Sequence, residues 1–454
     1  MLGWLKKVVG GAQAGLGSTP ARLPAKAVAA PPTVAAAIPA STAAAAAAAT
    51  PTATVFGVRR PLVAASGAVA GFEFSLPPAL SQRLHGNGDA VAQAAYQSAL
   101  VASARPVLLA SRRALLRVST PTLLRPGWAD QVPPGAMLLV DHLAQLPADV
   151  AQALRKNGAR LGVPDGPPAQ APAADFVVIE ASAGDIDTVL LSAQRWHEAR
   201  PRVPRVAIGL ACVDDIERVL RSGFTLASGH LDRSAAKATG KPLNAAAHRV
   251  CELLNHLAMD RDTAVVAQAV RADVAMSYRL LRYVNSPAIG LSRGVESVEH
   301  GVTVLGRNEL QRWLSVMLLS AADGRQATQA LQEHALARGR FLELLALQQG
   351  EATPQALFSL GLMSMLEVLL QCPLATAVAP LRLSANASQA LLQGTGAWAP
   401  YLAVAAVLET DDGAALNALS ARFGGADAVL DLAARAWGWA ADVAQVNTGS
   451  TDEV

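Results

Sequence analysis

The chain has 454 residues, with 38 lysines and arginines against 35 aspartates and glutamates, so its formal charge is only +3. This length suits two or three domains, and this charge argues against a strong field that would gather nucleic acid. Its three cysteines, Cys212, Cys251 and Cys372, are far apart and form no Cys-x-x-Cys pair. We therefore expect buried thiols and a cytoplasmic protein rather than a disulfide framework or a zinc knuckle.

Residues 1–53 are predicted to form a disordered Ala/Pro-rich segment. From residue 11 to 53 the charges are Arg22 and Lys26, and Ala43–Ala49 is pure alanine. The prolines break this segment and alanine is weakly apolar, so no membrane span is expected. In the opening "MLGWLKKVVGG" the lysines lie inside the apolar stretch, whereas a secretory signal has its positive charges before that stretch. The segment is either a frayed terminus or a short amphipathic tether.

Residues 54–235 alternate between short apolar runs and helical patterns. The runs are "ALLRVS", "AMLLVD", "RLGV", "FVVIEA" and "RVAIGLA". Between them lie "PADVAQALRKNG", "DIDTVLLSAQRWHEAR" and "VDDIERVLRSG", of which the first and last end at Gly158 and Gly223. Repeated strand-then-helix units predict an α/β domain with a parallel sheet or a barrel.

Chemistry in a parallel barrel takes place at the carboxyl ends of the strands. Here those ends offer isolated charges, among them Arg117, Asp141 and Glu180. Hydrolysis of a phosphodiester by metal-activated water needs several carboxylates around one or two divalent ions. The sequence therefore predicts no metal, no cofactor and no catalytic residue in this half.

Four segments, "VRRPLVAASGAVAGFEFSLPP", "ARLGVPDGP", "ADFVVIEAS" and "VAIGLACVDDIERVLRSGFTLASGHL", resemble the EAL domain, which hydrolyses cyclic di-GMP. The resemblance implies that Glu73 is the name-giving glutamate and Asp165 one of the paired aspartates. The remaining family positions fall on Arg117 for the asparagine, Leu139 or Asp141 for a glutamate, Pro164 for the first aspartate, Val178 for the lysine and Ile208 for the late glutamate. This implies a degenerate, inactive domain with vestigial site positions at Glu73, Arg117, Asp165, Val178 and Ile208.

Residues 236–447 read as all-α, followed by a disordered tail over 448–454. In "SYRLLRYVNSPAIGL" we expect one packed helix with Tyr278 on the apolar face, Tyr283 at its rim, and Arg279 and Arg282 on the opposite flank.

Further on, Ser297 should begin a helix that ends at Gly306. The next helix repeats apolar residues at Leu310, Trp313, Leu314, Met317 and Leu318. This helix-turn-helix pattern suggests DNA binding, but its expected outward side (Glu309, Arg312, Ser315, Val316 and Leu319) is too neutral and apolar.

Three segments, "VRADVAMSYRLLRYVNSPAIGL", "VESVEHGVTVLGRNELQRWLSVML" and "ALFSLGLMSMLEVLLQCPL", resemble the HDOD domain, a non-catalytic relative of the HD metal phosphohydrolases. The sequence contains no His-Asp doublet, and Ser364 and Met365 stand where the resemblance places it. His334 falls near the place of the first histidine, and we expect it to be a surface or capping residue.

Together these features predict a non-catalytic signalling or scaffold protein that binds other signalling proteins in cyclic di-GMP-related control of motility and biofilm. Binding of cyclic di-GMP or nucleic acid is not expected. The alternatives are a cyclic di-GMP receptor without hydrolysis, a residual phosphodiesterase and a nucleic-acid regulator. The candidate interaction surface, Arg279, Arg282 and Arg293, would dock an acidic partner or pair with Glu296, Glu299 or Glu309.

Overall fold

The structure is a computed structural model that describes residues 57–76, 90–169, 171–181, 185–235, 243–285, 294–320, 324–410 and 412–448. The Ala/Pro-rich segment 1–53, residues 449–454 of the predicted tail, and Arg293 lie outside the described residues. Among the described helices, none combines the length and apolar character that crossing a membrane requires.

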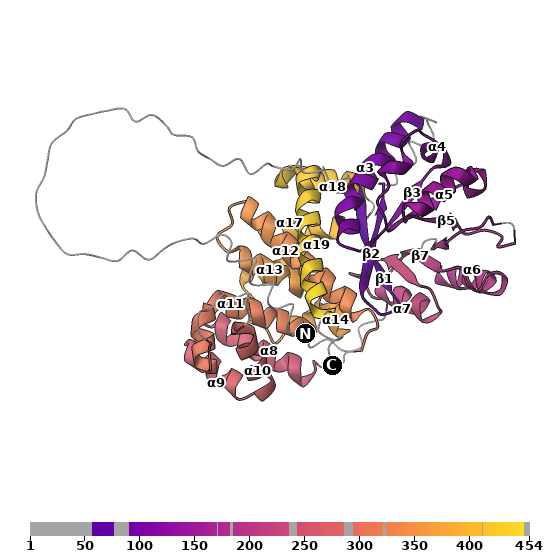
Figure 1. Cartoon of the computed structure of the whole chain (residues 1–454). Coiled ribbons are helices and arrows are strands. Elements are labelled where there is room, and N and C mark those ends of the chain that lie inside the picture. Colours follow the sequence, from indigo (N-terminus) through magenta and orange to yellow (C-terminus); the bar gives the residue numbers. More distant parts are fainter. Residues whose placement is uncertain are drawn as a thin grey trace, which may run out of the picture.

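Eight strands close into a barrel in chain order, which confirms the predicted α/β barrel-like domain (Figure 1). Strand β1 is antiparallel to its neighbours β2 and β8, and the remaining pairs are parallel. The strands are β1 (Val58–Ala64), β2 (Val69–Ser75), β3 (Arg113–Val118), β4 (Ala136–Val140), β5 (Arg160–Pro164), β6 (Phe176–Glu180), β7 (Arg205–Leu210) and β8 (Leu226–Gly229).

The helices of this half are α3 (Ala90–Leu109), α4 (Thr120–Leu123), α5 (Ala148–Lys156), α6 (Ile186–Ala199) and α7 (Val213–Arg221). The three predicted helical segments correspond to α5, α6 and α7. Gly158 and Gly223 follow α5 and α7 with φ of 83° and 89°, the left-handed conformation expected of a glycine after a helix. Helix α3 was not predicted, because its buried side includes alanines such as Ala94 and Ala104 that look like its exposed ones.

Apolar side chains fill the barrel interior. Alternate residues along the strands point inward, so the lumen is a packed core rather than a channel. The cluster consists of Leu62, Leu115, Met137, Leu139, Phe176, Val178, Val206, Ile208 and Leu226.

The C-terminal half is helical, as predicted. Its helices are α8 (Ala245–Ala258), α9 (Thr263–Arg271), α10 (Val274–Val284), α11 (Val298–Ser320), α12 (Thr328–Gln348), α13 (Pro354–Met363), α14 (Leu366–Leu370), α15 (Leu374–Val378), α16 (Ala385–Ser388), α17 (Ala399–Val407), α18 (Gly413–Ser420) and α19 (Ala426–Thr448). Ser297 accepts the amide of His300 at 3.2 Å as the predicted cap, and Gly306 interrupts α11 with φ 70° and ψ 172°.

The predicted orientation of α10 was wrong. Tyr278 is 61% exposed, whereas Tyr283 is fully buried and stacks on Trp313 with ring centroids 6.4 Å apart. The buried face is formed by Met276, Leu280, Tyr283 and Val284. Packing against α11 selects this face, because α10 carries apolar residues on more than one side and periodicity alone does not fix which side turns inward.

The second part of α11 is buried on both sides. Its predicted apolar residues, Leu310 to Leu318, are buried as expected. The side expected to face outward was predicted wrongly, since Arg312, Ser315, Val316 and Leu319 are buried too. Arg312 is neutralised there by Glu343 of α12, with Nη1 2.6 Å from Oε1. A helix enclosed in this way cannot enter a DNA groove, so the helix-turn-helix interpretation has no exposed recognition helix here.

The two halves share one core. Phe72 of β2 meets Trp437 of α19 edge to face at 5.0 Å, and α12 also packs against β2. The amide of Ala330, in α12, donates to the carbonyl oxygen of Gly67 in the β1–β2 turn at 2.9 Å. A single cluster of buried apolar residues runs from the barrel strands through α19. Figure 1 shows the long helix α19 on the side of the helical half that faces the barrel.

Buried ion pairs also cross this junction. Arg112 and Glu333 are 2.6 Å apart, with side chains 9% and 4% exposed. Arg325 lies 2.9 Å from Asp214 and 3.5 Å from Glu217 of α7. Such pairs oppose movement of the two halves relative to each other, because separating a pair would leave a buried charge without a counter-charge or water.

Candidate functional site

The mouth of the barrel carries an arginine held by acids. Arg117 is the next-to-last residue of β3, and its Nη2 lies 2.7 Å from Oε2 of Glu180 at the end of β6. Asp141, just after β4, approaches Arg117 Nη1 at 4.0 Å. The structure therefore brings together the isolated charges that the sequence places at separate strand ends. A guanidinium at this position repels a divalent cation.

Glu73 is buried inside the barrel wall. Its carboxylate accepts a hydrogen bond from Ser228 Oγ of β8 at 2.7 Å, and Ser228 is fully buried. Asp165, just after β5, faces another way: it accepts from Trp196 Nε1 at 2.8 Å and lies 3.5 Å from Arg195, both of α6. Each of the two acids thus has its own partners.

Three further positions that the resemblance assigns to EAL site residues are apolar and buried. Leu139, Val178 and Ile208 are between 2% and 5% exposed and belong to the barrel-interior cluster. Among the described residues no group of three or more histidines, cysteines or carboxylates is placed to hold a metal ion. The residues at this mouth do not fit the two-metal centre of an EAL phosphodiesterase, which needs converging oxygen ligands.

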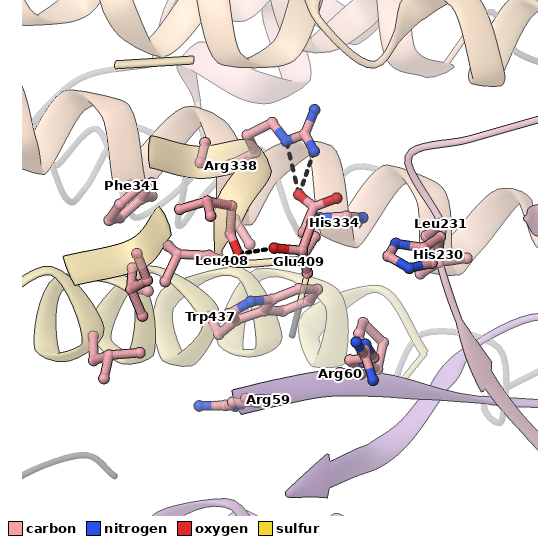
Figure 2. A pocket seen from close by; sticks show the side chains of 18 of the residues that line it. Arg59, Arg60, His230, Leu231, His334, Arg338, Phe341, Leu408, Glu409 and Trp437 are labelled. Carbon is pink, nitrogen blue, oxygen red and sulfur yellow. Dashed lines mark hydrogen bonds and ion pairs between the residues drawn. The ribbon is translucent and has the colours of Figure 1, made fainter. Parts of the chain in front are cut away.

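A second charged cluster lies where the resemblance places the HD ligands (Figure 2). Arg338 of α12 donates through Nε to Glu409 at 3.1 Å and through Nη1 to Ser364 Oγ at 3.3 Å. Asp232, which follows β8, lies 3.7 Å from the same guanidinium. We refer to Asp232, His334, Arg338 and Glu409 as the junction cluster, because it joins the barrel to the helices.

His334 was expected at the surface or at a helix cap, and this prediction was wrong. It is 5% exposed, its Nε2 lies 2.9 Å from Glu409 Oε1, and its ring stacks on Trp437 at 5.3 Å. Helix α12 is buried on nearly all sides, so a polar residue on it needs an internal partner. The spacing of His334 and Arg338 puts them on one helix face, but no local signal identified Glu409 or Asp232.

The cluster stabilises its own charges. Burial acts to raise the pKa of Asp232, but His230, Arg338 and His334 outweigh burial and hold that pKa far below its usual range. Burial acts to lower the pKa of Arg338, and the carboxylates of Glu409 and Asp232 raise it above its ordinary value instead. Asp232 and Arg338 therefore stay ionised near neutral pH.

The predicted arginine surface is described only in part. Arg279 is partly buried, and the side chain of Arg282 and all of Arg293 lie outside the described residues. Glu299, one of the acids considered as a partner, instead lies 3.3 Å from Arg271. Beside Arg279 on α10, Val274 and Tyr278 are 83% and 61% exposed.

Comparison with known proteins gives a family match for part of the helical half. Residues 242–394 match the HDOD domain family. Over 201 residues the chain is 24% identical to the uncharacterized protein YuxH of Bacillus subtilis, covering 44% of this chain and 49% of YuxH. Over 132 residues it is 28% identical to the cyclic di-GMP phosphodiesterase CdgJ of Vibrio cholerae, covering 29% and 30% of the two chains. These matches span half or less of each relative.

Among solved structures, the FimX EAL domain from Pseudomonas aeruginosa bound to c-di-GMP covers 38% of this chain and 87% of its own, with 12% identity and a TM-score of 0.30. The family match agrees with the resemblance found in the sequence. The chain carries an HDOD domain at residues 242–394.

Proposed function

We propose that this protein is a non-catalytic signalling or scaffold protein in cyclic di-GMP-related regulation, acting through binding to other proteins. The observation that carries the proposal is an arginine at each of the two sites that the EAL and HDOD resemblances identify, the barrel mouth and the junction cluster. Arg117 stands among acids at the barrel mouth, and Arg338 bridges Glu409 and Ser364 in the HDOD half. The link to cyclic di-GMP is supported by the relative CdgJ, named as a cyclic di-GMP phosphodiesterase.

Phosphodiester hydrolysis requires a nucleophilic water and stabilisation of the charge that develops on the phosphate oxygens. Arg117 could offer charge stabilisation, but Glu73 and Asp165 are engaged by Ser228 and Trp196. These residues do not provide ligands for a metal-bound hydroxide. The proposed function is therefore binding to other proteins rather than catalysis.

We expect the purified chain to leave cyclic di-GMP intact in the presence of Mg²⁺ or Mn²⁺. The reason is the apolar or cationic residues at Arg117, Leu139, Val178 and Ile208. Chromatography of the linear dinucleotide product would measure the activity, with an active EAL phosphodiesterase as the positive control. Turnover that disappears in Glu73→Ala would contradict the proposal.

A cyclic di-GMP receptor is the second candidate, because Arg117 is 46% exposed at the mouth and its guanidinium could meet a phosphate. We expect weak or undetectable binding by calorimetry, since the carboxylate–metal bridge to the phosphates has no residues to form it. A dissociation constant of about 1 µM or lower, weakened in Arg117→Ala, would favour the receptor instead.

The α10 surface is our proposed partner site. The proposal places both arginines at a binding surface, where a substitution rarely changes stability by more than ~0.5 kcal/mol. Replacing Arg279 and Arg282 with alanine should therefore shift the melting temperature by at most about 2–4 °C. Capture of the partner should weaken, because electrostatic complementarity speeds association. The matched control is Arg435→Ala, whose side chain is 60% exposed on α19. Unfolding of the double variant, or unchanged capture, would place the interface elsewhere.

A further inference from the structure

A cavity of about 80 Å³ lies at the junction of the two halves. Its walls come from β1, the residues after β8, helices α12 and α19, and the segment from 405 to 416 (Figure 2). Cavities between domains are common positions for small-molecule sites. The barrel-mouth site lies elsewhere, because Arg117 and Asp165 do not line the cavity, whereas His334, Arg338 and Glu409 of the junction cluster do.

Most of the wall is apolar. Leu231, Phe341, Leu408, Leu416, Leu430 and Trp437 line it. A cavity of ~150 Å³ holds a benzene ring, and this one is about half that size. The enclosed part therefore suits the short hydrocarbon part of a ligand whose polar end extends beyond it, rather than a whole aromatic ring or a nucleotide.

One wall carries a positive charge in excess. Arg59 of β1 lies over the ring of Phe72, with its guanidinium carbon 3.8 Å from the ring centroid. The nearby acid Glu333 is held by Arg112 through two hydrogen bonds of 2.6 and 3.1 Å. Two guanidinium groups thus share one carboxylate. Burial, and then the charge of Arg112, lower the pKa of Arg59 to about 9, a sign that its cation lacks sufficient compensation.

Several buried polar atoms of residues that line the cavity also lack hydrogen-bond partners among the described residues. Arg59 Nε, His334 Nδ1 and Glu409 Oε2 are buried, and none has a hydrogen-bond partner among the described residues. Buried polar atoms without partners are rare, and a bound molecule or ordered water commonly explains them. Here they lie around one apolar cavity.

We propose that this cavity binds a small aliphatic carboxylate, whose acidic group meets Arg59 and whose hydrocarbon part packs against Phe341 and Leu408. Glu409 and His334 can accept or donate to a hydroxyl group or water beside it. Since the walls belong to both halves, the bound acid stabilises the junction. Binding at this cavity is independent of any role of the protein in cyclic di-GMP signalling.

Isovalerate is the probe, and isovaleramide is its uncharged match. Titrated into the full chain, isovalerate should bind with a dissociation constant of about 1 mM, as expected for so few atoms, and should raise the melting temperature. Isovaleramide should bind at least ~10-fold more weakly, a factor that corresponds to ~1.4 kcal/mol. Equal binding of the two compounds, or no binding of isovalerate at about 10 mM, would overturn the proposal.

Two variants locate the site. Leu408→Trp fills the cavity and should abolish binding, whereas Leu392→Trp, at a side chain that is 46% exposed and outside the lining, should not. Arg59→Met keeps the apolar contact with Phe72 and should remove the preference for isovalerate over isovaleramide. If Leu408→Trp is misfolded by circular dichroism, Arg59→Met alone decides, and a preserved preference there would refute the site.

Discussion

Glu343→Leu should destabilise the protein by about 3–5 kcal/mol, because it leaves a buried arginine without its counter-charge. Arg312 and Glu343 have side chains only 1% and 4% exposed, with Nη1 2.6 Å from Oε1. The guanidinium also lies over Phe358 at 4.0 Å, so it cannot turn towards water without breaking the core. Arg340, 2.7 Å from the same carboxylate, loses its partner as well. Urea unfolding followed by circular dichroism would measure the loss.

Two further variants test the cause. Arg312→Met combined with Glu343→Leu should recover much of the stability, since an apolar pair needs no counter-charge. Glu299→Leu breaks the exposed pair with Arg271 and should change the stability far less than Glu343→Leu does, because water screens exposed charges. If Glu343→Leu destabilises the protein as little as Glu299→Leu, another group must balance the charge of Arg312.

Gly67→Ala should open the junction between the halves and cost about 2–4 kcal/mol, from backbone strain and steric overlap combined. Gly67 has φ of 83°, and a Cβ there would overlap the carbonyl oxygen of Gln326. The turn is also held by bonds from Ala330 N to Gly67 O at 2.9 Å and from Gln326 Nε2 to Ala65 O at 2.8 Å. Thermal unfolding and hydrogen exchange of the Ala330 amide would report the change.

The matched control is Gly127→Ala. Gly127 has φ of 74°, but apart from its own chain neighbours no atom of the described residues lies within 4 Å of the position its Cβ would take. It should therefore show the backbone strain of ~1–2 kcal/mol without the overlap. Equal losses in the two variants, with the Ala330 amide still protected, would mean that the turn does not hold the junction.

Local patterns were sufficient to predict most of the barrel. Runs such as "AMLLVD" and "FVVIEA" are too short for helices and are followed by segments with helical spacing, so β4 and β6 could be assigned. The phase of a helix is harder to predict. Tyr278 and Tyr283 exchanged their expected environments because α10 has apolar residues on more than one side, and contact with α11 decides which side is buried.

The charged sites depend on contacts between distant parts of the chain. Arg312 looks like a surface charge until Glu343, on another helix, is placed beside it. The junction cluster draws Asp232 from the segment after β8, Arg338 from α12 and Glu409 from the segment after α17. The pattern of residues within one helix or strand cannot predict this cluster, because its members come together only in the tertiary fold that joins the barrel to the helices.

The contact between Phe72 and Trp437 bears on how the protein is made. A ribosome adds about 5–20 residues per second, so the apolar face of the β1–β2 hairpin leaves the ribosome on the order of tens of seconds before its α19 partner exists. Until then the first strands of the barrel present uncovered apolar surface. Nascent chains should therefore need chaperone protection until α19 has been synthesised, and not only until the last strand of the barrel has been synthesised.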